Sequence, residues 1–492
     1  MNTPLNSQIS SKERLLLAGT FILFAIIYCL ISVVDHYQFK TAALDLGLYN
    51  NALYSFSHFK SNYFTLDLKA SGVNFFGDHF SPITYLYVPF YYIFGSYTRI
   101  IIQIASILWG GYGVYKCCKR KFPTGYIPLI ITFQFFGIWG IYGALSFDFH
   151  HNVVGAMVVP WLIYFYETQR KKNFLLCFIL VLTSKENMAL WLGFIMLGLM
   201  LKNGLRNYKN YLRFEIPLAA FALIYFFVTI TYVMPWLQSQ NTNYQFNHYG
   251  SLGNSMPQVM ANMFKHPLEV IRLLFENPTL SASEVNTKLE LHLAVLLSGG
   301  LALLYRPYYL VMLLPVYFQK LMTNDPSLSG VDAQYSIEFA PILSLALADS
   351  ISALSSQKMK MYFSSFYLIT TFIATFYLLD HMEISTNARF YKASHYDSDL
   401  NTSEIYDALK LIPQDVPVSA SSALTPHLAN REKIYAFPNI VDAQYILLLD
   451  AKVRSTYPLS IADYITRMDS LKNCGSFVTL YDKNQLLILK KK

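Results

Sequence analysis

Four short polar stretches of this sequence bring together the residue types that carry out proton transfer, phosphate binding and metal binding. They are Leu44–Leu53 with Asp45 and Tyr49, Gly77–Pro82 with Asp78 and His79, Phe147–His151 with Asp148 and His150, and Ser184–Asn187 with Lys185 and Glu186. Carboxylates can act as general bases and, with imidazoles, can bind divalent metal ions. A lysine can stabilise the charge of a departing phosphate. The sequence therefore predicts a functional site, provided that the fold brings these stretches together.

Each stretch also has a purely structural explanation. Asp45 is placed to cap or begin a helix, and Asp78 is placed to form a turn and cap before a helix. The His150–His151 pair suits a membrane interface, and the Lys185–Glu186 pair suits an ion pair within a turn. None of the four is specific alone, so the functional interpretation depends on their convergence at one place.

The composition places these stretches in a membrane protein. Of the 492 residues, 54% are hydrophobic and 14% are charged, whereas soluble proteins carry about 25% charged residues. The charge is unevenly distributed, because 25 of the charged residues lie in the 112 residues from His381 to Lys492. This pattern excludes a single soluble enzyme and a disordered chain. It predicts a membrane domain over residues 1–380 and a soluble α/β tail over residues 381–492.

The net charge of +8 does not indicate nucleic-acid binding. The basic residues lie in short clusters between apolar runs, such as Lys116–Lys121, Arg170–Lys172 and Lys202–Arg213. A nucleic-acid surface needs its basic groups on one continuous face, whereas short basic loops mark the cytoplasmic side of a membrane protein. The five cysteines show neither zinc-ligand spacing nor a pair in one oxidising compartment, so no disulfide and no zinc site are predicted.

The apolar runs and the basic clusters together predict eleven membrane spans, with the N-terminus in the cytoplasm and the C-terminus outside. Leu15–Val34 is long enough to cross about 30 Å of hydrocarbon, and no cleavage site follows it, so we interpret it as a retained first span. The other predicted spans alternate in direction and are Ile100–Tyr115, Gly125–Leu145, Val153–Tyr166, Phe174–Thr183, Met188–Leu201, Pro217–Met234, Leu291–Tyr305, Pro307–Met322, Phe339–Leu354 and Met361–Leu379.

Two apolar segments decide this topology. Counting Pro82–Gly95 as a span would place the Lys116–Lys121 cluster outside, so Pro82–Gly95 is predicted to lie along the outer surface. Phe174–Leu201 is long enough for one helix, but a hairpin places Lys172 and Lys202 on the same side. The hairpin is therefore the prediction.

The tail alternates short apolar runs with polar helical stretches, which predicts a small α/β fold outside the membrane. Its predicted strands are Val416–Ser419, Lys433–Phe437, Tyr445–Leu449, Ser476–Leu480 and Leu486–Leu489, and its predicted helices are Ser403–Leu411 and Ile461–Leu471.

The order of these pieces resembles the GT-C superfamily of glycosyltransferases, which use polyprenyl-phosphate-linked sugars. Asp45 follows the first span and opens a surface helix, a second surface helix contains Pro82, and the next span ends in basic residues. Over about residues 40–490 the chain more closely resembles an uncharacterised bacterial family of predicted membrane proteins with a domain of unknown function. The stretches that carry this resemblance are Asp45–Tyr49, Gly77–Pro82, Phe147–His150, Lys185–Glu186, Tyr249–Gly253, Gln334–Ser336 and Val418–Ser421.

The resemblance implies roles for individual residues. The superfamily places a catalytic acidic residue in the first outer loop, here about residues 35–96, and Asp45 takes that place. A second acidic residue usually follows it, where this chain has Leu46. Asp148 and His150 occupy the outer loop in which some members place a metal-binding acidic pair, so a divalent metal ion is a candidate cofactor.

The favoured hypothesis is an integral-membrane glycosyltransferase of the bacterial inner membrane that acts at the outer face. Its donor is a polyprenyl-phosphate-linked sugar, and its acceptor is a glycan, a lipid or a protein. The predicted catalytic residues are Asp45, Asp78 and His79, and the predicted substrate-binding residues are Tyr49, Lys185 and Glu186. Two alternatives stay open: a transporter or flippase of lipid-linked glycans, and a non-catalytic scaffold in envelope assembly. A transporter would need ionisable groups near the middle of the membrane.

Overall fold

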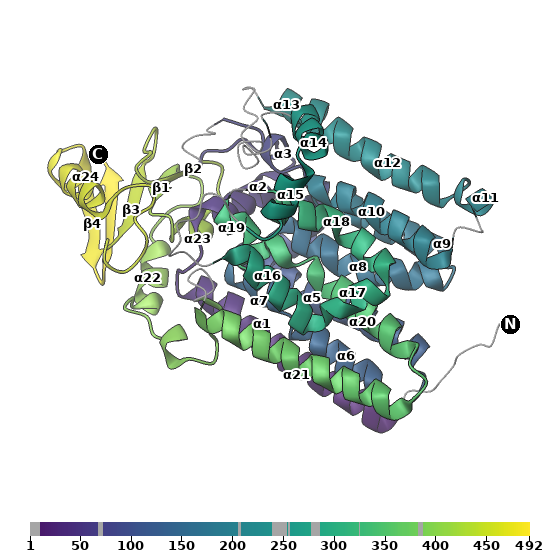
Figure 1. Cartoon of the computed structure of the whole chain (residues 1–492). Coiled ribbons are helices and arrows are strands. Elements are labelled where there is room, and N and C mark those ends of the chain that lie inside the picture. The colour runs from purple at the N-terminus through teal and green to yellow at the C-terminus, as the bar shows by residue number, and fades with distance from the viewer. Residues whose placement is uncertain are drawn as a thin grey trace.

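A bundle of long helices makes up most of the chain, and a mixed β-sheet lies at one end of the bundle (Figure 1). The computed structural model describes residues 10–66, 72–204, 208–238, 253, 256–276, 286–323, 325–381 and 387–492. Its bundle helices are α1 (Ser11–Tyr37), α5 (Thr98–Lys121), α6 (Ile127–Phe136), α7 (Trp139–Ser146), α8 (His151–Glu167), α9 (Lys171–Leu182), α10 (Glu186–Asn203), α12 (Glu215–Val228), α16 (Thr287–Val295), α17 (Leu301–Tyr305), α18 (Pro307–Leu321), α20 (Phe339–Ser352) and α21 (Gln357–His381).

Shorter helices connect and cover the bundle. They are α2 (Leu48–Ser57), α3 (Phe75–Asp78), α4 (Val88–Phe94), α11 (Tyr208–Tyr211), α13 (Met234–Leu237), α14 (Met256–Lys265), α15 (Pro267–Leu273), α19 (Pro326–Ser329), α22 (Thr402–Leu409), α23 (Thr425–Leu428) and α24 (Ile461–Asn473). Residues 249–252 of the stretch Tyr249–Gly253 lie outside the described residues, as do residues 382–386 at the start of the predicted tail.

Six helical segments of the described chain are long and apolar enough to cross a membrane. They are Ser11–Tyr37, Pro82–Lys121, Ile127–Ser146, Glu215–Leu237, Thr287–Tyr305 and Gln357–His381. The other five predicted spans correspond to α8, α9, α10, α18 and α20, which are 12 to 18 residues long. At 1.5 Å per residue these helices are roughly 18–27 Å long, somewhat less than a hydrocarbon core of about 30 Å. The chain is thus a multi-pass membrane protein, and the number eleven stays a prediction.

Ion pairs join several helices at one end of the bundle, here called the basic end. The ammonium nitrogen of Lys119 lies 2.6 Å from a carboxylate oxygen of Glu13 at the start of α1. The ammonium nitrogen of Lys202 lies 2.7 Å from Glu167 and 2.5 Å from Asp349. The ends of α5, α8, α10 and α20 therefore meet here. The opposite end, called the site end, carries the four polar stretches.

Helix boundaries agree with one of the predictions and correct another. The predicted hairpin is confirmed, because α9 and α10 are separate helices on either side of Thr183–Lys185. Pro82–Tyr87 forms a 3₁₀ turn that leads into α4, and Gly95 then turns the chain at a φ of 52°, which glycine adopts readily. The predicted loop Lys116–Lys121 is wrong, because these residues form the last turns of α5.

The tail forms a five-stranded sheet in the order β2-β1-β3-β5-β4. Its strands are β1 (Val418–Ala420), β2 (Ile434–Ala436), β3 (Tyr445–Leu449), β4 (Phe477–Lys483) and β5 (Leu486–Lys491). Strand β1 pairs in parallel with β2 and β3, whereas β5 pairs antiparallel with β3 and β4. Every strand and both predicted tail helices lie within three residues of their predicted boundaries. The core strand β3 is buried along its whole length.

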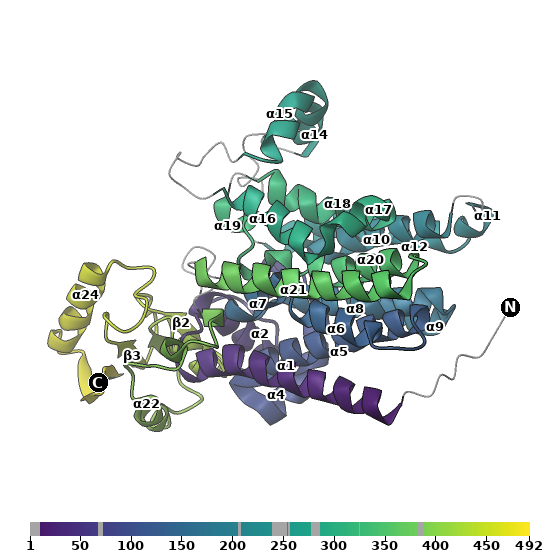
Figure 2. The ribbon, with the colours of Figure 1, turned by 60° about the horizontal axis from the view of Figure 1, so that its bottom comes forward.

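The tail covers α2, which corrects the prediction of a surface helix. Nine of the ten residues of α2 are buried, and Figure 2 shows α2 between the bundle and the sheet region. The side-chain amide of Asn51 donates to the carbonyl oxygens of Ala429 at 3.2 Å and Arg431 at 2.8 Å. The side-chain amide of Asn50 donates to the carbonyl oxygen of Pro426 at 3.3 Å. Because the tail accepts hydrogen bonds from both amide nitrogens, these donors are buried at little cost.

Candidate functional site

Asp45 lies in the tight loop Ala43–Gly47, which leads from the first bundle helix into α2. Its backbone angles, φ 68° and ψ −97°, are rare and strained for a residue that carries a side chain. Helix α2 begins without a side-chain hydrogen bond at its N-terminus, so the explanation of Asp45 as a helix cap is wrong. Strained backbone of this kind is common at functional sites.

Two hydrogen bonds hold the Asp45 loop from opposite sides. The carboxylate of Asp148 accepts a hydrogen bond from the backbone N–H of Ala42 at 3.0 Å. The hydroxyl of Ser422 accepts one from the backbone N–H of Ala43, also at 3.0 Å. The first contact comes from the bundle and the second from the tail. The position of Asp45 therefore depends on both parts of the chain.

Asp78 and His79 lie beside Asp45 and carry opposite charge when the imidazole is protonated. The Nδ1 atom of His79 is 3.5 Å from a carboxylate oxygen of Asp78. Burial raises the pKa of Asp45 above its usual value; the charges of His79 and Lys185 act against this rise, and that of Asp78 adds to it. The structure thus brings together the predicted catalytic residues and one predicted substrate-binding residue.

Lys185 is the cation of this cluster and directly precedes α10. Burial alone would lower its pKa, but the negative charges of Glu186, Asp45 and Asp78 and the phenol of Tyr335 raise it above the usual value. Lys185 therefore stays positively charged at neutral pH. Glu186 accepts a hydrogen bond from the backbone N–H of Phe80 at 3.1 Å, which ties the start of α10 to the Gly77–Pro82 stretch.

A buried network of aromatic and basic side chains supports the cluster. Tyr49 is 1% exposed, and its ring centroid lies 5.3 Å from that of His79 and 5.0 Å from that of His151. The guanidinium of Arg99 is 5.3 Å from the Tyr49 ring centroid and 2.9 Å from Nε2 of His151. The Nε2 atom of His151 also lies 2.8 Å from the hydroxyl oxygen of Thr84. The structure therefore places Tyr49 within this packing network, and a role in substrate binding stays a prediction.

Asp148 and His150 do not form a metal centre by themselves. Burial raises the pKa of Asp148 to about 8, and its carboxyl group already accepts a hydrogen bond from the backbone N–H of Ala42. The Nε2 atom of His150 is buried without a hydrogen-bond partner. Within the described ranges, no three His, Cys, Asp or Glu side chains are placed to bind one metal ion. A metal ion at this pair therefore stays a prediction and enters no step below.

Several supporting residues were not predicted as site residues, although Tyr335 lies in the stretch Gln334–Ser336 that carries the family resemblance. Tyr335 lies in the turn Ala333–Ser336, which packs against α7 at two glycines. A Cβ atom on Gly140 would overlap the carbonyl oxygen of Ser336, and one on Gly143 would lie 2.8 Å from the carbonyl oxygen of Ala333. The two glycines, spaced three residues apart on one helix face, allow the close approach that brings Tyr335 towards Lys185.

Arg99 was missed although it had a visible signal, whereas His151 was recognised as part of the His150–His151 pair but was given no role of its own. Arg99 is a single arginine at the edge of a long apolar run, and such a charge next to hydrocarbon is costly unless it has a role. His151 stands beside His150 in the sequence, and only the fold shows that it, rather than His150, contacts Arg99.

Comparisons with known proteins identify the fold. A family model described as "Predicted membrane protein (DUF2079)" matches residues 35–465. No curated protein sequence matches the chain. Among solved structures, the chain is similar to the crystal structure of ArnT from Cupriavidus metallidurans bound to undecaprenyl phosphate. The TM-score is 0.51 at 11% identity, and the match covers 96% of this chain and 98% of that chain. At this identity the similarity shows the fold alone, which is GT-C-like.

Proposed function

The chain belongs to the DUF2079 family of predicted membrane proteins, and we propose that it is a membrane glycosyltransferase that uses a polyprenyl-phosphate-linked sugar. Its family membership and its GT-C-like fold confirm the resemblance predicted from the sequence. The observation that carries the proposal is the convergence of Asp45, Asp78, His79 and Lys185 at the site end. Undecaprenyl phosphate, present in the similar ArnT structure, is the product that such a transfer would release.

We further propose that the site end faces outward from a bacterial inner membrane, with eleven crossings. The support is that basic residues gather at the opposite end, as expected for the cytoplasmic side. Helices α5, α8, α10 and α20 end there, whereas α1 and α18 begin there. This arrangement gives a cytoplasmic N-terminus and an outer tail.

The proposed reaction needs a base and a cation on either side of the sugar. The acceptor hydroxyl gives its proton to the carboxylate of Asp45, and its oxygen attacks the anomeric carbon. The bond from that carbon to the phosphate oxygen breaks, and polyprenyl phosphate leaves with the bonding electrons. Lys185 stabilises the negative charge of the leaving phosphate. The raised pKa of Asp45 makes it a stronger base than an ordinary carboxylate.

A lipid-linked donor has a route to the site along α12. The ring of Phe80, within the Gly77–Pro82 stretch, lies 6.2 Å from the ring of Tyr225 on α12. The same helix exposes Phe221, Ile224 and Phe227, each more than half exposed in the chain by itself. In a membrane these side chains contact lipid, so a polyprenyl chain held against α12 reaches the polar cluster directly.

The distribution of charge favours an enzyme over the two alternatives. Between their two ends, the described bundle helices carry no Asp, Glu, Lys or Arg, so a charged substrate meets no ionisable group at midplane. A scaffold would not require a strained carboxylate and a lysine placed together beside hydrocarbon, because ionisable groups there are costly.

Undecaprenyl phosphate release tests the proposal without knowledge of the acceptor. Mass spectrometry of lipid extracts should show one polyprenyl-phosphate-linked sugar accumulating in a deletion strain. Membranes that contain the chain should then convert that lipid to undecaprenyl phosphate, and membranes from the deletion strain should not. An unchanged lipid profile together with no release would refute a transferase activity.

A further inference from the structure

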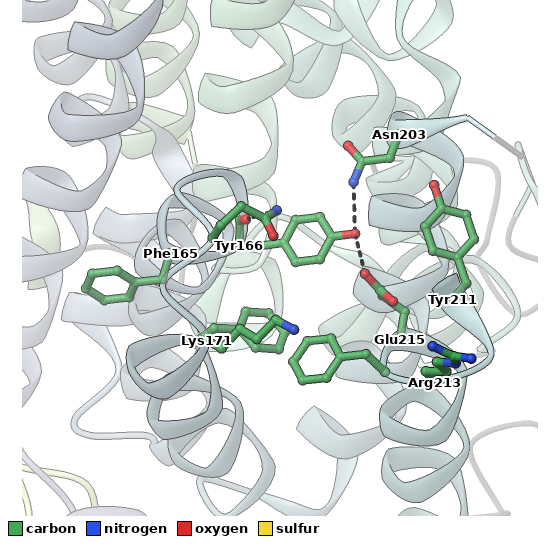
Figure 3. Close-up of a pocket in the computed structure, with 10 residues that line it drawn as sticks. Phe165, Tyr166, Lys171, Asn203, Tyr211, Arg213 and Glu215 are labelled. Atoms are coloured by element: carbon green, nitrogen blue, oxygen red, sulfur yellow. Dashed lines mark hydrogen bonds between the residues drawn. The ribbon is translucent and has the colours of Figure 1, made fainter. Parts of the chain in front are cut away.

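A cavity at the basic end lies apart from the polar cluster around Asp45. Its volume is about 410 Å³, within the range of small-ligand sites. It is lined by residues of α8 to α12 and their connections, and the close-up in Figure 3 shows them: Phe165, Tyr166, Gln169, Lys171, Phe174, Asn203, Tyr211, Arg213, Phe214 and Glu215. Neither the proposed transfer reaction nor the ion pairs that join the helix ends uses this cavity.

One wall of the cavity holds a fixed carboxylate. The hydroxyl of Tyr166 donates to Glu215 at 3.0 Å and accepts from the side-chain amide of Asn203 at 2.9 Å. Figure 3 shows the Tyr166 hydroxyl between these two side chains. The Asn203 amide orients the Tyr166 hydroxyl, and this hydroxyl binds one oxygen of the Glu215 carboxylate. The other carboxylate oxygen can therefore accept a hydrogen bond from a ligand.

The other polar groups of the lining are two cations. The ammonium of Lys171, at the start of α9, lies 5.3 Å from the ring centroid of Phe214. Arg213 precedes Phe214 in the chain and contributes a guanidinium. Two cations and one carboxylate give the lining a charge of +1 with both signs present. A guanidinium and an ammonium suit a phosphate, whereas a carboxylate among aromatic rings suits an ammonium group.

The surroundings of the cavity are those of a lipid headgroup. Leu176 and Ile179 on α9 are exposed in the chain by itself, as are Ile216 and Ile224 on α12. These apolar faces begin where the cavity ends, so the cavity lies at the boundary between hydrocarbon and the basic loops. Basic pockets between membrane helices at this level bind lipid headgroups.

We propose that this cavity binds the headgroup of a phospholipid that carries both a phosphate and an ammonium group. The phosphate lies at Lys171 and Arg213, the ammonium lies at Glu215 among the aromatic rings, and the acyl chains run along α9 and α12. A purely anionic headgroup would place negative charge beside Glu215. The proposal does not depend on the function of the site around Asp45.

Lipid retention by the purified full-length chain tests this inference. The chain is reconstituted with equal amounts of phosphatidylethanolamine and phosphatidylglycerol, and retained lipids are counted by native mass spectrometry. We expect about three- to tenfold preference for phosphatidylethanolamine, which is within the range for one net hydrogen bond. Glu215→Gln still accepts from Tyr166 but loses the charge, so the preference should disappear. Glu215→Asp should restore part of it.

A neighbouring lysine supplies the matched control. Lys171→Ala should lower retention of both lipids, whereas Lys172→Ala, on the same turn but outside the lining, should leave both unchanged. Melting temperatures of the variants check that the bundle is intact. Equal retention of the two lipids by the unmodified chain would overturn the proposal. So would an unchanged preference in a folded Glu215→Gln variant.

Discussion

Replacing Asp45 by asparagine removes one charge and leaves the shape of the site nearly intact. Asparagine tolerates the positive φ of 68° about as well as aspartate does. The loop is anchored through the backbone of Ala42 and Ala43, and these bonds do not involve the Asp45 side chain. Burial already disfavours the ionised form of Asp45. We therefore expect the stability of Asp45→Asn to stay within about 1 kcal/mol of that of the unmodified chain.

The expected loss of activity is much larger than this change in stability. Loss of a general base lowers a rate by about 10²–10⁴-fold, which corresponds to roughly 3–5 kcal/mol in activation free energy. The pH dependence should change as well. Activity of the unmodified chain falls as the pH drops through the raised pKa of Asp45, because the base becomes protonated. The residual activity of Asp45→Asn should lack this acidic limb.

Release of undecaprenyl phosphate per amount of folded protein measures the effect. Asp407→Asn is the matched control, because Asp407 is 72% exposed in the tail and pairs only at the surface with Lys410. Such surface pairs contribute about 0–1 kcal/mol, so this variant should keep normal activity. If Asp45→Asn folds normally and retains more than about half of the rate, Asp45 is not the base, and the reasoning from its position fails.

Three further predictions concern the cation, the loop anchor and the topology. Lys185→Met should lower the transfer rate by about 10²–10³-fold, the loss expected when one group that stabilises a leaving oxyanion is removed. Recovery of activity in Lys185→Arg would show that the positive charge is the reason. Burial raises the pKa of Asp148 from its ordinary value of 3.8 to about 8, so the folded state favours the protonated carboxyl group. The folded state therefore loses stability progressively as the pH rises from about 4 towards 8. Asp148→Asn should therefore melt higher than the unmodified chain at pH 8 but not at pH 4 in thermal-shift measurements; parallel melting curves would contradict this. Two cysteine variants in a background without native cysteines test the topology. An impermeant reagent added to intact cells should label Phe59→Cys, a fully exposed position just after α2. It should spare Thr124→Cys, in the exposed turn after α5. Labelling of position 124 would overturn the proposed orientation.

Sequence patterns were sufficient where local burial decides the structure. The five strands of the tail lie close to their predicted positions because short apolar runs bounded by turn residues are typical of buried strands. The break between α9 and α10 was likewise predictable, since a hairpin places Lys172 and Lys202 on the same side of the membrane. The four polar stretches were recognisable for the same reason, because charged residues beside hydrocarbon are costly.

The tertiary structure alone decided how these residues work together. Asp148 was a candidate metal ligand, and only the fold shows that its carboxyl group also holds the backbone at Ala42, 106 residues away in sequence. Helix α2 was expected at the surface, but the tail, more than 370 residues further along the chain, buries it through the amides of Asn50 and Asn51. Such contacts leave no periodic pattern in the sequence. Each depends on hydrogen bonds that form only after the helices have packed, because a buried polar group takes whichever partner the fold presents.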